Sequence, residues 1–497
     1  MEKYKNIFDT THLNSDLKKR SLRSGAVTLT SQVVMFIIQL GSTMILARIL
    51  SPEDYGINAM AVTITGFAKV FGSLGLSTAT IQRSDINHQQ VSTLFWINVV
   101  VGALITMIVA VLSPLVAWFY KTPEMLWVML ALSSMFFING LVVQHSALLN
   151  RQMRFYSLAK IQVFSMLAGI GVAIVAAQHG FGYWALVFHS LTQLLVSALC
   201  TWFAVGWIPG LPRRNAGVGS MVKFGSDLVG FNVINYFSRN LDNILIGRYH
   251  GSGALGFYSK AYQLLMMPIT NLRDPMTRVA TPALSRLQHE PEQYREYYLR
   301  CISLLAFVSM PLVVFLFVCS DQLIGLVLGA QWLGASEIFK ILAIAALFQP
   351  VWSTSGMVLI STGRSRRYLI LGTVNAVLIS ISFVLGLPWG GKGVATAYAI
   401  IMYLILFPNL FYAYKGTSIS IKDFILSVYR PLVAGLVMGF GCFLLLRLIG
   451  DINVLAELII AFTTCAGMYL LTFSALSGGI FDLHEYFSYG RLIFEGK

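Results

Sequence analysis

Long apolar stretches recur along nearly the whole chain and limit what it can fold into. About fourteen runs of roughly 20 or more mostly apolar residues alternate with short polar connections. A helix needs about 20 such residues to cross the hydrocarbon core of a bilayer. Charged residues make up only 11% of the chain, against roughly 25% in soluble domains. The sequence therefore predicts an all-α polytopic membrane protein.

The limits of the apolar runs give the expected crossings, which cover residues 24–47, 54–80, 91–119, 124–147, 157–178, 181–208, 218–247, 253–282, 297–319, 335–360, 367–388, 391–414, 427–449 and 452–475. Connections are short, so we expect no inserted soluble domain. Residues 1–23 are polar, and we expect no cleavable signal peptide before the first crossing.

Lysine and arginine are unevenly divided between the two sides of this topology. The loops on the side of the N-terminus carry 24 of them, and five lie on the other side: Arg48, Lys121, Arg248, Lys392 and Arg447. Because cytoplasmic loops carry the excess of basic residues, we expect both termini in the cytoplasm. The same asymmetry accounts for the net charge of +14 without a nucleic-acid partner.

An internal repeat suggests how the helices are grouped. The segment ILARILSPEDYG (45–56) resembles ILIGRYHGSGALG (244–256), and Arg48 and Gly56 fall 200 residues before Arg248 and Gly256. The seventh crossing would then repeat the first, giving the two six-helix lobes of a transporter architecture. We expect a cytoplasmic N-terminal segment, an N-lobe, a C-lobe and an added helix pair with a C-terminal tail, over residues 1–23, 24–208, 209–414 and 415–497.

Ionisable residues at membrane depth gather in the seventh and eighth crossings. Such residues are costly unless they face a partner or a water-filled cavity. They are Lys69 in the second crossing, then Asp227, Arg239, Asp242, Lys260, Arg273, Asp274 and Arg278. Helical spacing puts most of them on polar faces, which predicts a hydrated cavity between the lobes. Its lysine and arginine residues outnumber its aspartates, so we expect it to bind an anionic head group such as a pyrophosphate.

Some of these charges have a purely structural alternative. Arg239 and Asp242 are three residues apart, and Asp274 and Arg278 are four apart, spacings that suit ion pairs within one helix. Lys69 and Lys260 have no carboxylate at such a spacing, which favours contact with a ligand. The eighth crossing also contains Pro268, Pro275 and Pro282, which favour bends.

Cofactor and metal chemistry have no signature in the chain. The five cysteines lack CxxC spacing and the histidines are scattered, so we expect the cysteines to be packing residues and predict no metal site. The phosphate loop GxxxxGK[ST] of ATP-driven pumps does not occur either. We therefore expect no cofactor.

Several motifs resemble those of a known family. The stretches ARILSPEDYG (47–56), GLSTATIQR (75–83), FWIN (95–98), GFYSKAYQLLMMP (256–268) and RVATPALSRLQ (278–288) are similar to the polysaccharide-transport members of the MOP exporter superfamily. The chain resembles Wzx-type flippases in particular, in the branch of colanic-acid-exporter-like proteins. Its length and number of crossings agree with this resemblance.

The resemblance implies a fold like that of MATE transporters and the lipid II flippase MurJ. It also implies export of undecaprenyl-pyrophosphate-linked oligosaccharides across the bacterial inner membrane, for exopolysaccharide or O-antigen synthesis. Membrane lipids, a polymerase and export machinery are the implied partners. Related lipid II flippases carry a basic residue where this chain has Gln263, one turn after Lys260. We predict Lys69, Arg239, Lys260, Gln263, Arg273 and Arg278 as head-group contacts.

Four alternatives remain open at this point, and one of them is a lipid scaffold that transports nothing, for which a charged cavity would have no use. An ion-coupled multidrug or cation antiporter of the same superfamily would use Asp227, Asp242 and Asp274, which are also our candidates for ion coupling in a flippase. Transport could instead run downhill, drawn by polymerisation on the far side. An enzyme of the same pathway is the fourth alternative, but the longest outer loop (320–335) holds one acid and no histidine, so we expect no enzyme.

Overall fold

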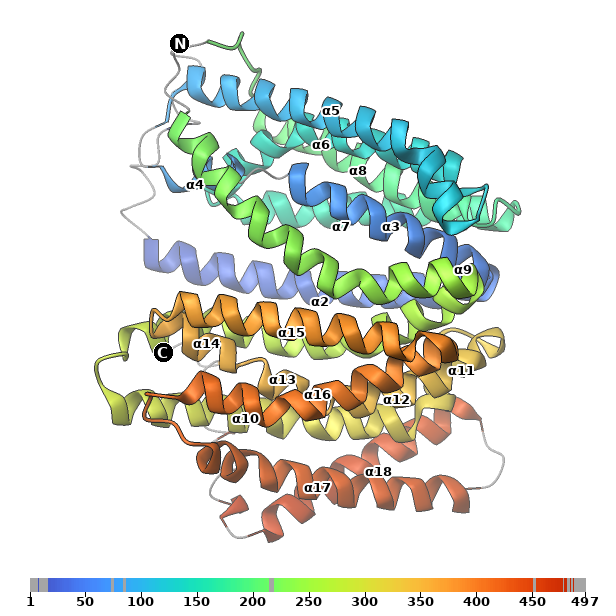
Figure 1. Ribbon diagram of the computed structural model, residues 1–497, viewed down its shortest axis with the longest axis vertical. Coiled ribbons are helices and arrows are strands. Elements are labelled where there is room, and N and C mark those ends of the chain that lie inside the picture. The colour runs from blue at the N-terminus through green and yellow to red at the C-terminus, as the bar shows by residue number, and fades with distance from the viewer. Residues whose placement is uncertain are drawn as a thin grey trace. The chain divides into compact units, whose positions relative to one another are not determined.

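Helices form all the regular elements that the structure, a computed structural model, describes (Figure 1). The described residues are 8, 17–72, 76–83, 86–213, 219–449, 453–476, 478–480, 483 and 486. Contacts within the chain separate two compact units, residues 1–256 and 257–497. The lobe boundaries expected at 208/209 and 414/415 stay a prediction.

Unit 1 holds the helices before the middle of the chain. They are α2 (Leu17–Ile49), α3 (Pro52–Gly72), α4 (Leu76–Gln82), α5 (His88–Tyr120), α6 (Met125–Arg151), α7 (Phe155–Gln178), α8 (Trp184–Val205) and the first part of α9 (Gly219–Arg286). Helix α5 packs along α6, and α7 packs along α8 and α2 (Figure 1).

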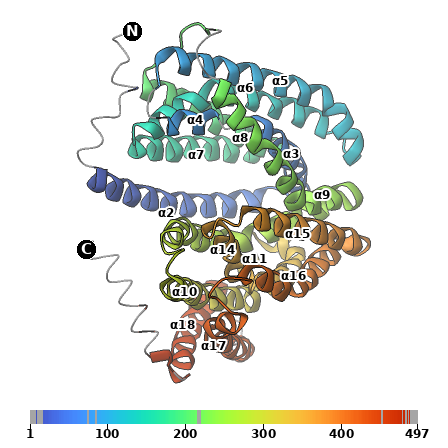
Figure 2. The ribbon, with the colours of Figure 1, turned by 60° about the vertical axis from the view of Figure 1, so that its left-hand side comes forward.

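Unit 2 begins within α9 and runs to the end of the chain. Its further helices are α10 (Pro291–Val318), α11 (Ser320–Val327), α12 (Ser336–Ala346), α13 (Gln349–Trp352), α14 (Ser355–Ser361), α15 (Ser365–Gly386), α16 (Gly390–Tyr414), α17 (Ile421–Leu448) and α18 (Val454–Ala475). Helices α10, α17 and α18 lie side by side, and α15 forms an antiparallel hairpin with α16 (Figures 1 and 2).

Fewer helices are long and apolar enough to cross a membrane, within the described ranges, than the sequence predicts. Within the described ranges, nine helices are long and apolar enough to cross a membrane, or ten if a bent pair counts as one crossing. One of the nine, Ser365–Tyr414, contains both helices of the α15–α16 hairpin. The polytopic all-α membrane fold is confirmed, whereas the count of fourteen is not.

The crossing expected at 335–360 is wrong as a single helix. The chain forms α12, α13 and α14 there, with a bend of 42°. Pro350 explains the break, because its ring nitrogen cannot donate to a carbonyl one turn earlier. In α9, by contrast, the helix continues through Pro268, Pro275 and Pro282, and it leaves helical geometry at Gly251 (φ 82°, ψ −178°).

Glycine allows close helix packing inside unit 1. A Cβ atom on Gly102 of α5 would lie 2.5 Å from the carbonyl oxygen of Phe136, and one on Gly140 of α6 would lie 2.6 Å from that of Asn98. Small residues let membrane helices approach closely, because association there depends on van der Waals packing. The two contacts lock α5 against α6 at two points one helical turn apart.

Buried tyrosines tie the broken segment of unit 2 to its neighbours. The hydroxyl of Tyr298 on α10 makes hydrogen bonds with Thr354 (3.0 Å) and with the hydroxyl of Tyr414 at the end of α16 (2.9 Å). Tyr294 reaches Ser361 at the end of α14, at 2.7 Å. Buried polar groups need such partners, so these bonds hold the helices around residues 351–361 in place.

Candidate functional site

The repeated motifs of the sequence meet within unit 1. A Cβ atom on Gly56 would lie 1.8 Å from the carbonyl oxygen of Ser252, and one on Gly256 would lie 1.9 Å from that of Pro52. The contact is reciprocal, since Ser252 and Gly256 stand 200 residues after Pro52 and Gly56. Only glycine fits at both positions, because each approach is made to backbone that cannot rotate away.

Local sequence explains why α3 begins at this contact. Ser51 accepts a hydrogen bond at its Oγ from the backbone N–H of Asp54 (3.2 Å), and Asp54 accepts one at Oδ2 from the backbone N–H of Ser51 (2.9 Å). These two bonds form a capping box, and Pro52 follows at the first helical position, where its missing N–H costs nothing. The motif S-P-E-D therefore fixes the first turn of α3 beside Gly256.

Helix α3 also packs against the first part of α9 further along. The hydroxyl of Tyr236 donates to the carbonyl oxygen of Thr63 at 2.7 Å, and the rings of Phe67 and Phe237 lie 4.8 Å apart. A Cβ atom on Gly66 would lie 2.2 Å from the Tyr236 hydroxyl. The two helices thus share an extended contact. Each helix carries a basic residue within a few sequence positions of this contact.

Those basic residues are Lys69 on α3 and Arg239 on α9. Both side chains are exposed, and neither makes a hydrogen bond or ion pair with another described residue. Asp242 differs, because it is only 5% exposed and accepts a hydrogen bond at Oδ1 from the backbone N–H of Asn243 (2.8 Å). The alternative of a structural Arg239–Asp242 ion pair is therefore not formed, and the side chains of Lys69 and Arg239 are available to an anion.

In unit 2 the second part of α9 carries the remaining candidates. The Lys260 ammonium donates to Oε1 of Gln263 at 3.0 Å, so the two residues form one polar group across a turn of the helix. The Arg273 guanidinium donates to Oδ1 of Asp274 from both Nη2 (2.7 Å) and Nε (3.0 Å).

The Arg273–Asp274 pair changes the expected pattern of charges. The sequence spacing suggests Asp274 and Arg278 as partners, but the side chain of Arg273 folds along the helix surface to the adjacent carboxylate. Arg278 is left exposed, with no ion pair or hydrogen bond to the described part of the chain. Asp227 belongs to α9, but its side chain lies outside the described residues.

A buried arginine is a polar feature that the sequence analysis missed. Arg151 is 7% exposed at the end of α6, and its Nη1 donates to the carbonyl oxygens of Thr80 (3.2 Å) and Arg83 beyond the end of α4. A guanidinium suits this place because the last carbonyls of a helix lack partners. In the sequence, Arg151 falls in a predicted loop and counts among the basic residues that set the orientation of the chain in the membrane. No pattern in the sequence indicates that it is buried.

The cysteines behave as the sequence predicts. All five are free thiols, and Cys319, Cys442 and Cys465 belong to one buried apolar cluster of α10, α17 and α18. Over the described residues, no group of three or more histidine, cysteine or acidic side chains is placed to hold a metal ion.

Comparison with curated proteins finds relatives in polysaccharide synthesis. The teichuronic acid biosynthesis protein TuaB of Bacillus subtilis is 29% identical over 90% of this chain and 94% of its own length. The lipopolysaccharide biosynthesis protein WzxC of Escherichia coli is 24% identical over 84% of this chain and 85% of its own.

Solved structures with a similar fold are transporters. The lipid II flippase MurJ in an inward closed conformation superposes with a TM-score of 0.73 at 16% identity, over 92% of this chain and 98% of its own. An inward-facing MATE multidrug transporter of the MOP superfamily gives 0.60 at 13% identity, over 80% and 94%. The sequence profile described as "Polysaccharide biosynthesis protein" matches residues 45–337, more than half of the chain. This chain is a member of that polysaccharide biosynthesis protein family, with the fold of the MOP transporters.

Proposed function

We propose that this protein is a flippase that moves undecaprenyl-pyrophosphate-linked oligosaccharide repeat units from the cytoplasmic to the outer leaflet by alternating access. Exopolysaccharide or O-antigen synthesis is the pathway class, and the inner membrane is the location, with both termini in the cytoplasm. Its family and its transporter fold support this proposal. A polymerase and export machinery would take up the product.

The proposal rests mainly on the exposure and lack of partners of two basic side chains. Lys69 and Arg239 are exposed on helices of a membrane protein and have no partner among the described residues, while Asp242 is buried. The sequence predicts both residues at membrane depth, where an unpaired cation is costly unless it binds a partner or faces a water-filled cavity. A pyrophosphate carries dense negative charge and accepts hydrogen bonds from several basic side chains at once. Arg278 is the corresponding candidate of unit 2.

The contact between the repeats supports a mechanism with moving parts. Gly251 joins the two parts of α9 in a backbone conformation that is essentially restricted to glycine. Next to it, residues 252–256 lie against the first turn of α3. A hinge beside a close contact is the arrangement that a rocking transporter needs, since the contact can open while the hinge absorbs the rotation.

The experiment that tests the proposal measures where the lipid-linked sugar lies. The gene is deleted in its own host, and accumulation of a lipid-linked oligosaccharide on the cytoplasmic leaflet is measured with and without complementation. We expect rescue by the wild-type gene and strongly reduced rescue by Lys69→Gln and Arg239→Gln. Arg213→Gln is the matched control, because it removes an exposed arginine of the same unit from a loop.

Other outcomes would change the assignment. Without any accumulation in the deletion strain, the flippase proposal fails and the cation antiporter becomes the better interpretation, with the buried Asp242 as its acid. Equal rescue by Lys69→Gln, Arg239→Gln and Arg213→Gln would leave transport standing and remove these two cations from the head-group site.

A further inference from the structure

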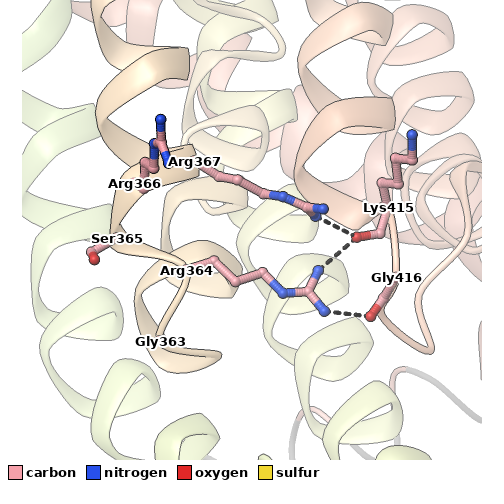
Figure 3. A pocket seen from close by; sticks show the side chains of 7 residues that line it. All are labelled: Gly363, Arg364, Ser365, Arg366, Arg367, Lys415 and Gly416. Carbon is pink, nitrogen blue, oxygen red and sulfur yellow. Dashed lines mark hydrogen bonds between the residues drawn. The ribbon is translucent and has the colours of Figure 1, made fainter.

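A hollow at one end of unit 2 gathers basic residues from two distant parts of the sequence (Figure 3). Helices α15 and α16 run antiparallel, so the start of α15 lies next to the end of α16. The hollow between these ends has a volume of about 610 Å³. It is lined by Gly363, Arg364, Ser365, Arg366, Arg367, Lys415 and Gly416. Four of these seven residues are basic and none is acidic.

Two of the arginines are fixed in place by main-chain carbonyl groups. Arg364 donates from Nη1 to the carbonyl oxygen of Lys415 at 2.6 Å and from Nη2 to that of Gly416. Arg367 donates from Nη1 to the same Lys415 oxygen at 2.8 Å. The carbonyl groups at the end of a helix carry partial negative charge, which offsets the repulsion between two neighbouring guanidinium groups. Both cations are therefore held in position before a ligand arrives.

The other two basic side chains are free. Arg366 and Lys415 make no hydrogen bond or ion pair with a described residue through their side chains. Figure 3 shows them extending in the same direction, on either side of Arg367. Four like charges with no acid among them repel one another, and an anion placed between them would remove that repulsion. Ser365, the first residue of α15, also lines the hollow, and no side-chain hydrogen bond caps this helix start.

The surroundings of the pocket indicate where such an anion comes from. Immediately beyond it, Leu369 and Ile370 on α15 and Phe411 on α16 are exposed apolar side chains. Both helices lie in a stretch apolar enough to cross the membrane. The pocket therefore stands at the end of a membrane-crossing hairpin, at the level where phospholipid head groups lie above their acyl chains.

We propose that this pocket binds the phosphate group of an anionic phospholipid. Arg364 and Arg367 form its fixed base, and Arg366 and Lys415 close around the phosphate from its two sides. Guanidinium groups match phosphate oxygens in geometry as well as charge. The lipid's acyl chains lie against Leu369, Ile370 and Phe411. Because lipid binding is measured without transport, this proposal stands or falls separately from the proposed function.

The test compares two double variants of the full-length chain that lose the same charge. Arg366→Gln with Lys415→Gln removes the free cations of the pocket, and Arg286→Gln with Lys422→Gln removes two exposed cations elsewhere in unit 2. Native mass spectrometry of the purified protein with phosphatidylglycerol measures lipid affinity, with phosphatidylcholine as the neutral lipid. A parallel titration uses sodium pyrophosphate in detergent without added lipid.

The expected result is a preference for phosphatidylglycerol that the pocket variant loses. Each basic group near a membrane surface contributes roughly fivefold to the affinity for an anionic lipid, so the pocket variant should bind about 25-fold more weakly. The control variant should bind like the wild type. Both variants should elute and melt like the wild type, because none of the four side chains has a partner to lose.

Two results would overturn the proposal. Equal phosphatidylglycerol affinity in the wild type and both variants would show that the cations do not form a site. Tight binding of pyrophosphate, lost in the pocket variant, together with no preference for phosphatidylglycerol over phosphatidylcholine, would show that a soluble phosphate and not a lipid is the ligand.

Discussion

Gly256 lies so close to Pro52 that a Cβ atom on the glycine would come within 1.9 Å of the proline carbonyl oxygen. Its counterpart in the first repeat, Gly56, lies equally close to Ser252. The two similar sequence motifs, 45–56 and 244–256, are therefore in direct contact in the structure. The contact gives the first prediction, because its two sides can be changed one at a time.

Gly256→Ala and Gly56→Ala should each force the two segments apart. The atoms that the new methyl group meets are backbone, so one helix must move, and overpacking of this kind costs about 1–3 kcal/mol. We expect a lower melting temperature in detergent and reduced complementation of a deletion strain. The matched control is Gly253→Ala, whose Cβ would lie 3.0 Å from the flexible carboxylate of Glu53. Equal losses in all three variants would show that the close approach does not matter.

The contact between α3 and α9 predicts a non-additive pair of mutations. Gly66→Ala places a methyl group 2.2 Å from the hydroxyl of Tyr236 and should destabilise the protein. Tyr236→Phe removes that hydroxyl and its bond to Thr63, a loss of about 1 kcal/mol. When it is combined with Tyr236→Phe, Gly66→Ala should cost less, by roughly 1 kcal/mol in a double-mutant cycle of unfolding free energies. Strict additivity would contradict the packing described for these helices.

Tyr298→Phe should weaken unit 2 by removing the centre of its buried tyrosine network. The change leaves the hydroxyls of Thr354 and Tyr414 each without one partner, at a cost of about 1–3 kcal/mol in unfolding free energy. The measurement is thermal or denaturant unfolding of the purified protein. Tyr156→Phe serves as control, since Tyr156 is 61% exposed and we expect no measurable change there.

Asp242→Asn should separate ion coupling from substrate binding if transport is driven by a proton or sodium gradient. Asp242 is buried, whereas Asp274 is about half exposed and paired with Arg273. We therefore expect Asp242→Asn to abolish the response of transport in proteoliposomes to an imposed gradient, and Asp274→Asn to keep it. If wild-type transport ignores both gradients, the coupling hypothesis fails and movement is drawn by polymerisation.

The sequence predicts the helices well because membrane crossing imposes a strong and regular pattern. Crossings such as 91–119 and 157–178 match α5 and α7 to within a few residues. The interruption at Gly251 also falls between two expected crossings. Pro350 carries a signal for the break of 335–360, since a proline inside a helix removes a hydrogen bond, but the apolar pattern outweighs it when crossings are assigned by composition.

Partners of the charged side chains are harder to predict. Spacing alone gives Asp274 and Arg278 as a pair, but the long side chain of Arg273 can reach the same carboxylate from the adjacent position. Spacing fixes which residues share a face and leaves the choice of rotamer open. The basic pocket was predictable in part, because an antiparallel hairpin brings residues 364–367 close to Lys415, about 50 residues away.

Pro52 contacts Gly256, and Gly56 contacts Ser252, a reciprocal pattern with the form of an interface between two identical subunits, in which one patch meets its own copy. In a homodimer any mutation changes both sides of the interface at once. Here the two sides belong to one chain and differ: the first begins a capped helix at Pro52, and the second has glycines at 251 and 253. The first side is therefore a fixed helix start, and the second contains a joint in a backbone conformation that favours glycine.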